Sequence, residues 1–116
     1  MTELQHSITH NLIEMEWQLG HPFFTWNDNS YWFVPSVAEF KRDLDTGGFV
    51  IVKMMTSTVR RFNRDGTNVF DSIALPTAQQ KITYNVDNLE YRIESIRTDP
   101  SLSYFRMIAV GTARGI

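Results

Sequence analysis

The first twenty positions of the chain carry apolar residues with the period of a helix. One stripe recurs at spacings of four, three and four residues. It consists of Ile8, Leu12, Met15 and Leu19, and Ile13 and Trp17 widen it. Thr2 is suited to cap the first turn, and Gly20 followed by Pro22 supplies a stop. The pattern predicts an amphipathic helix over residues 1–20.

After residue 20 the pattern changes to short apolar runs separated by turn-forming residues, which predicts strands. Aromatic residues on both sides of the turn Asn27–Ser30 predict a hairpin over residues 22–35. Residues 36–48 fit either one or two turns of helix or a loop over the mouth of a barrel. The further predicted strands cover residues 49–62, 81–84, 89–96 and 102–110.

Two segments between and after these strands lack a clear period. Residues 63–66 form a turn, and residues 67–80 read as a long loop with at most a short strand around Val69 and Phe70. The end of the chain, residues 111–116, reads as an exposed polar tail.

The run from Leu89 to Ile96 suggests how the strands assemble. Leu89, Tyr91 and Ile93 alternate with polar residues, and Ile96 breaks the alternation by one position, which predicts a β-bulge near Ser95. A short antiparallel sheet that is bent by a bulge tends to close. The predicted fold is mainly β: a small antiparallel barrel of about six strands with an N-terminal helix. The chain is expected to be one domain, with the helix at 1–20, the barrel at 21–110 and the tail at 111–116.

Composition narrows the classes of function. The chain has no cysteine, which excludes disulfides and thiolate metal sites. Eleven basic against thirteen acidic residues argue against a protein that binds mainly by neutralising phosphates. The expectation is a soluble protein made in the cytoplasm, because no basic leader and no long apolar run is present. The 13% aromatic content is a large contact area for a small domain.

Several residue groups could carry chemistry, and each has a simpler structural explanation. His6, His10 and Glu14 share a helical face at metal-binding spacing, but the glutamate of a zincin motif is missing, so a solvated or interface face is favoured. The aspartates lie almost entirely in turns, where they bond their own backbone. The turn at residues 64–68 lacks the alternating acidic ligands of a calcium loop. We predict no catalytic, cofactor-binding or metal-binding residues, no cofactor and no enzymatic activity.

A nucleic-acid-binding barrel is a further alternative. Such barrels stack bases on strand aromatics. The candidates are Phe33, Tyr84, Tyr91 and Tyr104 for stacking, and Arg60, Arg61 and Arg64 for phosphates. The balanced charge and the need to fill a small core weigh against this function.

The segment from Leu75 onward has a recognisable order: a proline, a short strand, a turn, Tyr91-Arg92-Ile93, an Asp99-Pro100 turn and a last apolar strand. This order resembles the C-terminal half of the head-completion proteins of tailed bacteriophages, also called head–tail connector or stopper proteins. The hairpin that ends at Val34-Pro35 and the Gly47-Gly48 entry into a long strand are also similar to that family. The resemblance covers most of the chain after residue 20.

This resemblance implies a structural protein of the virion neck. Copies of the chain would form a ring, expected to be six-fold, between the portal or adaptor and the tail terminator or tail tube. The ring would close the filled head, dock the tail and let genomic DNA pass without specific binding, with no membrane involved. The loops 62–80 and 36–48 would be candidates for a gate that holds DNA in the channel. The C-terminal residues 111–116 of the chain would contact the adaptor or the phage tail. Another neck or tail role, such as tail terminator or adaptor, is the alternative.

Overall fold

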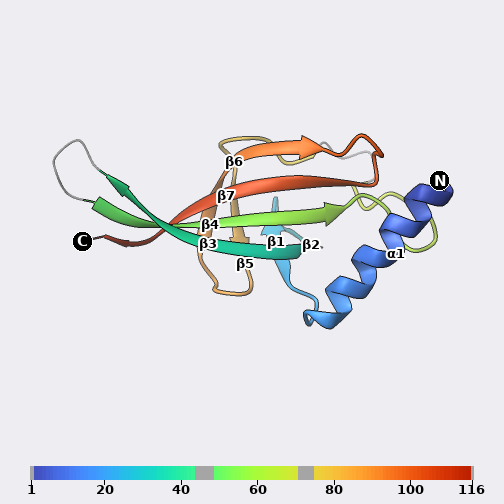
Figure 1. Cartoon of the computed structure of the whole chain (residues 1–116), viewed down its shortest axis with the longest axis horizontal. Coiled ribbons are helices and arrows are strands. Elements are labelled where there is room, and N and C mark those ends of the chain that lie inside the picture. Colours follow the sequence, from blue (N-terminus) through green and yellow to red (C-terminus); the bar gives the residue numbers. More distant parts are fainter. Residues whose placement is uncertain (1, 44–48, 71–74, 116) are drawn as a thin grey trace.

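The structure, a computed structural model, describes residues 2–43, 49–70 and 75–115, with the backbone alone described at 37–43, 49–52 and 112–115. One helix is followed by seven strands (Figure 1). The helix is α1 (Glu3–Gln18), and the strands are β1 (Phe23–Trp26), β2 (Asn29–Trp32), β3 (Val34–Asp43), β4 (Phe49–Arg60), β5 (Lys81–Tyr84), β6 (Glu90–Thr98) and β7 (Tyr104–Gly115). The predicted mainly β class with an N-terminal helix is confirmed.

Helix α1 begins and ends as its sequence predicts. The Thr2 hydroxyl accepts from the Gln5 backbone N–H, and the Gln5 side chain accepts from the Thr2 backbone N–H, which completes a capping box. Gly20, with a φ of 76°, follows the last turn.

The buried face of α1 differs from the predicted stripe. The residues that α1 buries are Thr9, Leu12, Ile13 and Glu16. Met15 and Leu19 belong to the predicted stripe but stay exposed, as does Trp17. The helix is therefore turned so that two polar side chains, Thr9 and Glu16, face the sheet.

All seven strands belong to one antiparallel sheet in the order β2-β1-β5-β6-β7-β4-β3. Residues 36–43, for which the sequence suggests helix turns or a loop, belong to β3 and pair with β4. That prediction is wrong because pairing with a long β-branched strand outweighs the weak helical spacing of this segment. Residues 44–48 lie outside the described residues. Residues 111–115 continue β7 alongside β4, so their backbone lies in the sheet where the sequence suggested a tail.

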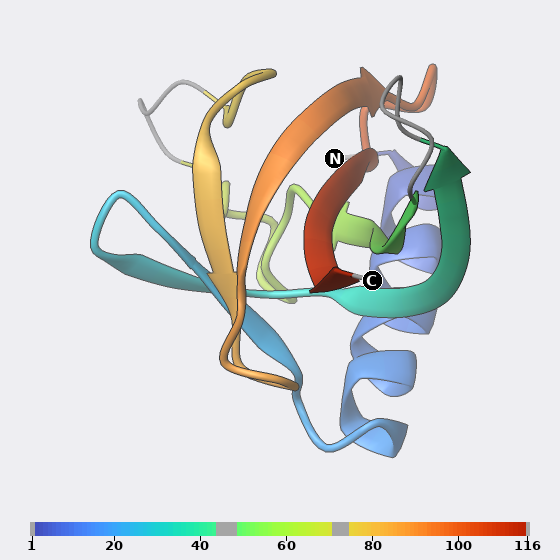
Figure 2. The same cartoon turned by 90° about the vertical axis from the view of Figure 1, so that its left-hand side faces the viewer.

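The sheet is strongly curled but does not close into the predicted barrel. Within the described residues no ladder joins its two edge strands, β2 and β3. They are instead consecutive in the chain, since Phe33 alone separates Trp32 from Val34. Phe33 is buried, and its N–H donates to the Pro22 carbonyl. Figure 2 shows β2 and β3 as one path across the curled sheet.

The core fills the concave side of this curl and is mostly aromatic. Its central side chains are Phe24, Phe33, Met55, Val59, Tyr84, Tyr91, Ile93, Phe105 and Met107. The register in β6 is as predicted for Tyr91 and Ile93, which are buried, whereas Leu89 is exposed. The pairing of β6 with β7 shifts between Ile93 and Ser95, which confirms the predicted bulge.

The segment after β4 is held against the body rather than extended as a long free loop. The turn at residues 63–66 is present, and Asn63 N–H donates to the Thr67 carbonyl. Phe70 is buried, stacks on Tyr31 with ring centroids 4.6 Å apart and meets Phe105 edge-on. The short strand expected around Val69 is reduced to a single bridge between Phe62 and Asn68. Residues 71–74 are not described.

Beyond this body, β3, β4 and β7 extend together as an arm (Figure 1). The molecule measures 52 × 28 × 26 Å, and its radius of gyration is 15.5 Å. A compact domain of this length is expected to have a radius of about 13 Å. The arm thus gives the chain a long shape with two different ends.

Candidate interaction site

Two tryptophans and a histidine form an exposed aromatic cluster where α1 ends and β2 passes. The ring of His21 lies between the two indoles, with centroids 4.3 Å from Trp17 and 4.8 Å from Trp32. The Trp17 and Trp32 side chains nevertheless remain 63% and 46% exposed. Aromatic side chains that are held in position but open to solvent are typical of contact sites between proteins.

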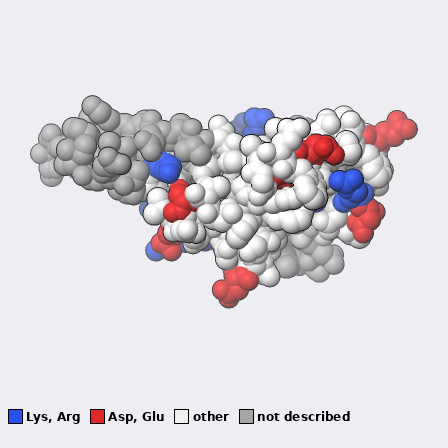
Figure 3. Space-filling model, turned by 90° about the horizontal axis from the view of Figure 1, so that it is seen from below, with Lys and Arg blue, Asp and Glu red and all other residues white. Residues whose placement is uncertain are grey.

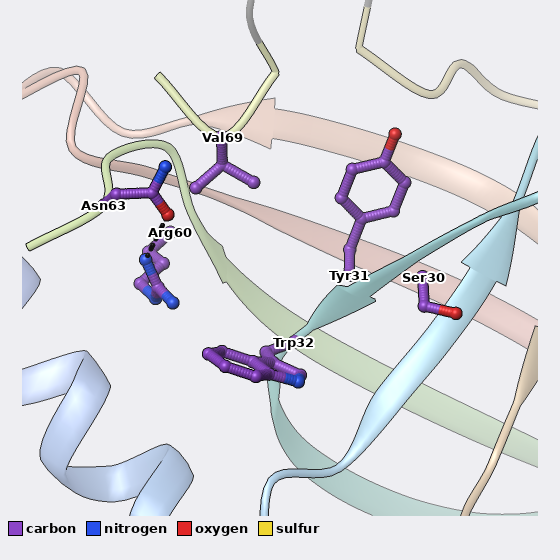
Figure 4. Close-up of a pocket in the computed structure, with 6 residues that line it drawn as sticks. All are labelled: Ser30, Tyr31, Trp32, Arg60, Asn63 and Val69. Atoms are coloured by element: carbon purple, nitrogen blue, oxygen red, sulfur yellow. Dashed lines mark hydrogen bonds between the residues drawn. The ribbon is translucent and has the colours of Figure 1, made fainter. Parts of the chain in front are cut away.

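This cluster forms one wall of a broad hollow of about 570 Å³ between α1 and the sheet. Ile13, Arg60, Asn63 and Arg64 also line this hollow. A second hollow of about 220 Å³ adjoins it and shares Trp32, Arg60 and Asn63 (Figure 4). Seen from below, the described acidic and basic side chains are interspersed, and no large patch of one sign stands out (Figure 3). We call the larger hollow the aromatic groove.

A buried ion pair fixes the floor of the aromatic groove. Arg60 Nε donates to both carboxylate oxygens of Glu16, at 3.0 and 3.2 Å, and so ties β4 to α1. Arg60 Nη1 donates to the Phe62 carbonyl at 2.7 Å and to Asn63 Oδ1 at 3.3 Å. The guanidinium also lies 5.5 Å from the Trp32 ring centroid, which is a cation–π distance. Arg60 therefore positions the tryptophan and the helix at once.

The electrostatics of this ion pair favour a structural role. Burial raises the pKa of Glu16 above its ordinary range, and the attraction of Arg60 offsets only part of that rise. All of the Arg60 contacts described above are to groups of the protein itself. The pair holds the groove in shape and offers no proton acceptor near an exposed nucleophile.

A second polar cluster anchors the β5–β6 hairpin to β4. Tyr91 Oη donates to Asp87 Oδ2 at 2.6 Å, and Lys53 Nζ lies 3.3 Å from the same oxygen. Next to it, the Tyr84 and Ser57 hydroxyls are 2.7 Å apart and buried. Burial raises the pKa of Tyr84 well above its usual value, so Tyr84 stays neutral. These contacts fasten the hairpin and are explained by structure alone.

The residues singled out in the sequence are distributed as follows. His10 Nε2 lies 3.9 Å from Glu14 Oε1 on the exposed side of α1. Asp65, Asp87 and Asp99 each accept the backbone N–H two residues further on, which confirms the predicted turn role. In the part of the chain that is described, no three histidines or acidic residues are placed to hold a metal ion.

The aromatics suggested for base stacking are mostly in the core. Phe33, Tyr84 and Tyr91 are buried, and Tyr104 is half-buried. Arg60 is paired with Glu16, so the basic cluster at residues 60–64 is not a continuous exposed surface. Among the residues whose side chains are described, the exposed aromatics are instead Trp17 and Trp32, which the sequence analysis assigned to a helix face and a hairpin. Neither assignment placed the two side chains together.

Comparisons with protein-family models, with curated proteins and with solved structures found no significant match. No helix among the described residues has the length and apolar character needed to cross a membrane. What the chain does must therefore follow from its own residues and from the resemblance in its sequence.

Proposed function

We propose that this chain is a structural connector of the bacteriophage neck, which forms a ring between the portal or adaptor and the tail. The ring closes the filled head and gives the tail a surface on which to dock. The observation that carries the proposal is the aromatic groove: two exposed tryptophans on either side of His21, with Trp32 also lying against the guanidinium of the buried Glu16–Arg60 pair. Such a surface suits a permanent contact and not a reaction.

The shape of the molecule supports the same function. A subunit of a closed ring needs two different patches that fit one another. The chain has an aromatic groove beside α1 at one end and a three-stranded arm at the other (Figure 1). A net charge of −2 also suits a channel through which DNA passes, because a strongly basic lumen would hold the phosphates back.

Fewer residues are available for a gate than the two long loops of the sequence analysis suggest. Residues 36–43 are strand, and Phe70 is buried against Tyr31. Deletion of residues 63–71 would remove this buried ring, so that deletion would damage the fold as well as any gate. The connector proposal does not depend on a gate in this segment.

The decisive experiment is to disrupt the gene in the phage that encodes it. We expect filled heads that lose DNA and do not join tails, and free tails beside them in electron micrographs. Purified protein added to such an extract should restore infectious particles. Complete, infectious virions without the chain would contradict the proposal.

A matched pair of variants tests the role of the groove in this assay. Trp17→Ala and Trp32→Ala remove exposed rings, so both should fold, with melting temperatures close to wild type, yet restore infectivity poorly. Val86→Ala is the control, because Val86 is a similarly exposed apolar residue in the β5–β6 turn. Full restoration by both tryptophan variants would exclude the groove as a contact surface.

A further inference from the structure

Helix α1 carries an apolar stripe that its own sheet does not cover. The stripe contains Leu4, Ile8, Met15 and Leu19. Leu4, Met15 and Leu19 are 61%, 43% and 52% exposed. Three of these four residues form most of the stripe that the sequence predicts as the apolar face. Ile8 is half-buried, and the stripe lies beside the face that α1 buries against the sheet. A helix that is apolar on two sides is expected to be covered on both.

The charge of α1 indicates what covers this second stripe. The helix contains no lysine or arginine, and its exposed acidic residues include Glu3 and Glu14. Eleven residues separate these two, which is close to three full turns, so they lie in line along one side of α1, about 16 Å apart. The covering surface should therefore combine aliphatic groups with cations.

A surface of that kind lies on the outer side of β6 and β7, opposite the core. Arg97 and Arg106 are direct cross-strand partners, and both are exposed. They line a hollow of about 370 Å³ together with Ser95, Ile96 and Ile108. Two like charges placed opposite one another destabilise a sheet slightly. The guanidinium of Arg106 lies 6.0 Å from the Tyr104 ring centroid, and an acidic partner would relieve the repulsion that remains between the two arginines.

The spacing of cations on this surface fits the acidic side of α1. Arg92 is exposed on the same side of β6 as Arg97. The bulge takes up one residue between them, since their β7 partners Val110 and Arg106 are four residues apart. About 13 Å of strand thus separates the two arginines, and their long side chains can reach acids about 16 Å apart. Acidic groups are also close: Glu94 lies in the bulge and Asp99 at the end of β6, next to Arg106. Glu90, two residues before Arg92, pairs with Lys81 of β5. The cations Lys81, Arg92, Arg97 and Arg106 thus exceed the acids Glu90, Glu94 and Asp99 by one, and Ile108 provides half-exposed aliphatic surface.

We propose that α1 of one copy docks onto the outer face of β6 and β7 of the next copy. The stripe of α1 covers the hollow at Ile108, and Glu3 and Glu14 pair with Arg92 and with the Arg97–Arg106 pair. The two surfaces are different patches of the same chain, so the contact repeats head to tail and closes a ring. The inference rests on the proposed ring and names the surfaces that build it.

The absence of cysteine allows a direct test by cross-linking. Tagged Glu14→Cys protein is mixed with untagged Arg97→Cys protein and treated with a short bis-maleimide at rising protein concentration. Because only one of the two proteins is tagged, a product with the combined size of one tagged and one untagged chain must join two different chains. We expect this product in at least fivefold excess over the same mixture made with Asp28→Cys, an exposed residue of the β1–β2 turn, in place of Glu14→Cys. Equal yields at all concentrations would overturn the inference.

Charge reversal separates this contact from other ways to form a ring. E3K/E14K protein and R97E/R106E protein should each self-associate about tenfold more weakly than wild type in sedimentation equilibrium. In an equimolar mixture, each contact between unlike chains again brings opposite charges together at positions 97 and 106, so association should recover. The chain with all four changes should recover only part of the loss, because Arg92 is unchanged and then faces a lysine. Asp28→Lys is the control and should have no effect.

The outcomes distinguish the two proposals. Rings that form with unchanged strength in all charge variants would refute the docking surfaces and leave the connector function standing. A chain that never associates, alone or on portal complexes, would refute both. Salt-dependent binding of wild type to DNA that is lost in R97E/R106E while association persists would assign the arginines to nucleic acid and overturn the inference.

Discussion

The ion pair between Glu16 and Arg60 predicts an unusual dependence of stability on pH once the arginine is replaced. Arg60→Met keeps most of the side-chain volume but leaves the Glu16 carboxylate, which is 1% exposed, without its counter-charge. With about 4 Å between charge centres and an effective dielectric constant of about 20, the lost attraction is about 4 kcal/mol. Removal of one partner from a buried pair usually costs about 3–5 kcal/mol. We expect a loss of about 3–4 kcal/mol in the free energy of unfolding at pH 8.

The same loss should shrink in acid. Burial already raises the pKa of Glu16, and without Arg60 the pKa rises further. An acid whose pKa is higher in the folded than in the unfolded state destabilises the fold as pH rises from its unfolded pKa, about 4.3, to its folded pKa. The Arg60→Met variant should therefore be closer to wild type at pH 5 than at pH 8.

Urea denaturation of four proteins at both pH values measures this effect. They are the wild type, Arg60→Met, Glu16→Leu and the double variant, in which an apolar pair replaces the ions and should recover most of the loss. Hydrogen exchange in α1 shows whether the helix detaches before the sheet unfolds. If the Arg60→Met loss were equal at pH 5 and pH 8, or the two single losses simply added, the ion pair would not hold α1 in the way described.

Three other changes have defined outcomes. Phe70→Ala removes the ring stacked on Tyr31 and should cost about 3–4 kcal/mol in a thermal or urea melt, whereas a loss under 1 kcal/mol would place residues 62–70 outside the core. Gly111→Ala should destabilise the fold, because its Cβ would lie 3.2 Å from both the Glu90 carbonyl oxygen and the Tyr91 ring, and an unchanged or higher melting temperature would contradict this close packing. Although burial raises the pKa of Asp87, hydrogen bonds from Tyr91 and neighbouring donors lower it overall, so Asp87→Asn should be less stable than wild type at pH 7. A carboxyl whose pKa is lowered by folding stabilises the fold fully above its unfolded pKa and loses this contribution as pH falls through its folded pKa. The stability difference between wild type and Asp87→Asn should therefore narrow below about pH 4, and a difference that widens in acid would contradict this role of Asp87.

Local patterns in the sequence were sufficient to predict most of the strands of the sheet. The break in alternation at Ile96 located the bulge, since a shift by one position has no other simple cause in a strand. The 81–84 strand was predicted with its bounds. The hairpin turn was predicted at Asn27–Ser30, but the turn itself is Asn27 and Asp28 alone, both with positive φ, and the next two residues belong to β2.

Features that depend on distant partners could not be predicted in this way. The helical period predicted Leu12 and Ile13 on the buried face correctly. It could not place Glu16 there, because the partner of Glu16 is Arg60, which lies 44 residues away in the chain. Likewise, β3 is a strand because β4 pairs with it along ten residues. The aromatic groove arises only when the chain reverses at His21 and brings Trp17 towards Trp32.

The single residue between β2 and β3 also affects how the protein responds to force. These strands form opposite borders of the sheet, and peptide bonds through Phe33 join them. A pull that tries to unroll the sheet is therefore borne by covalent backbone at this corner and not by a row of hydrogen bonds in parallel. The curl resists flattening for as long as the Phe33 ring stays packed inside it, so the covalent link at Phe33 keeps the two edges of the sheet together.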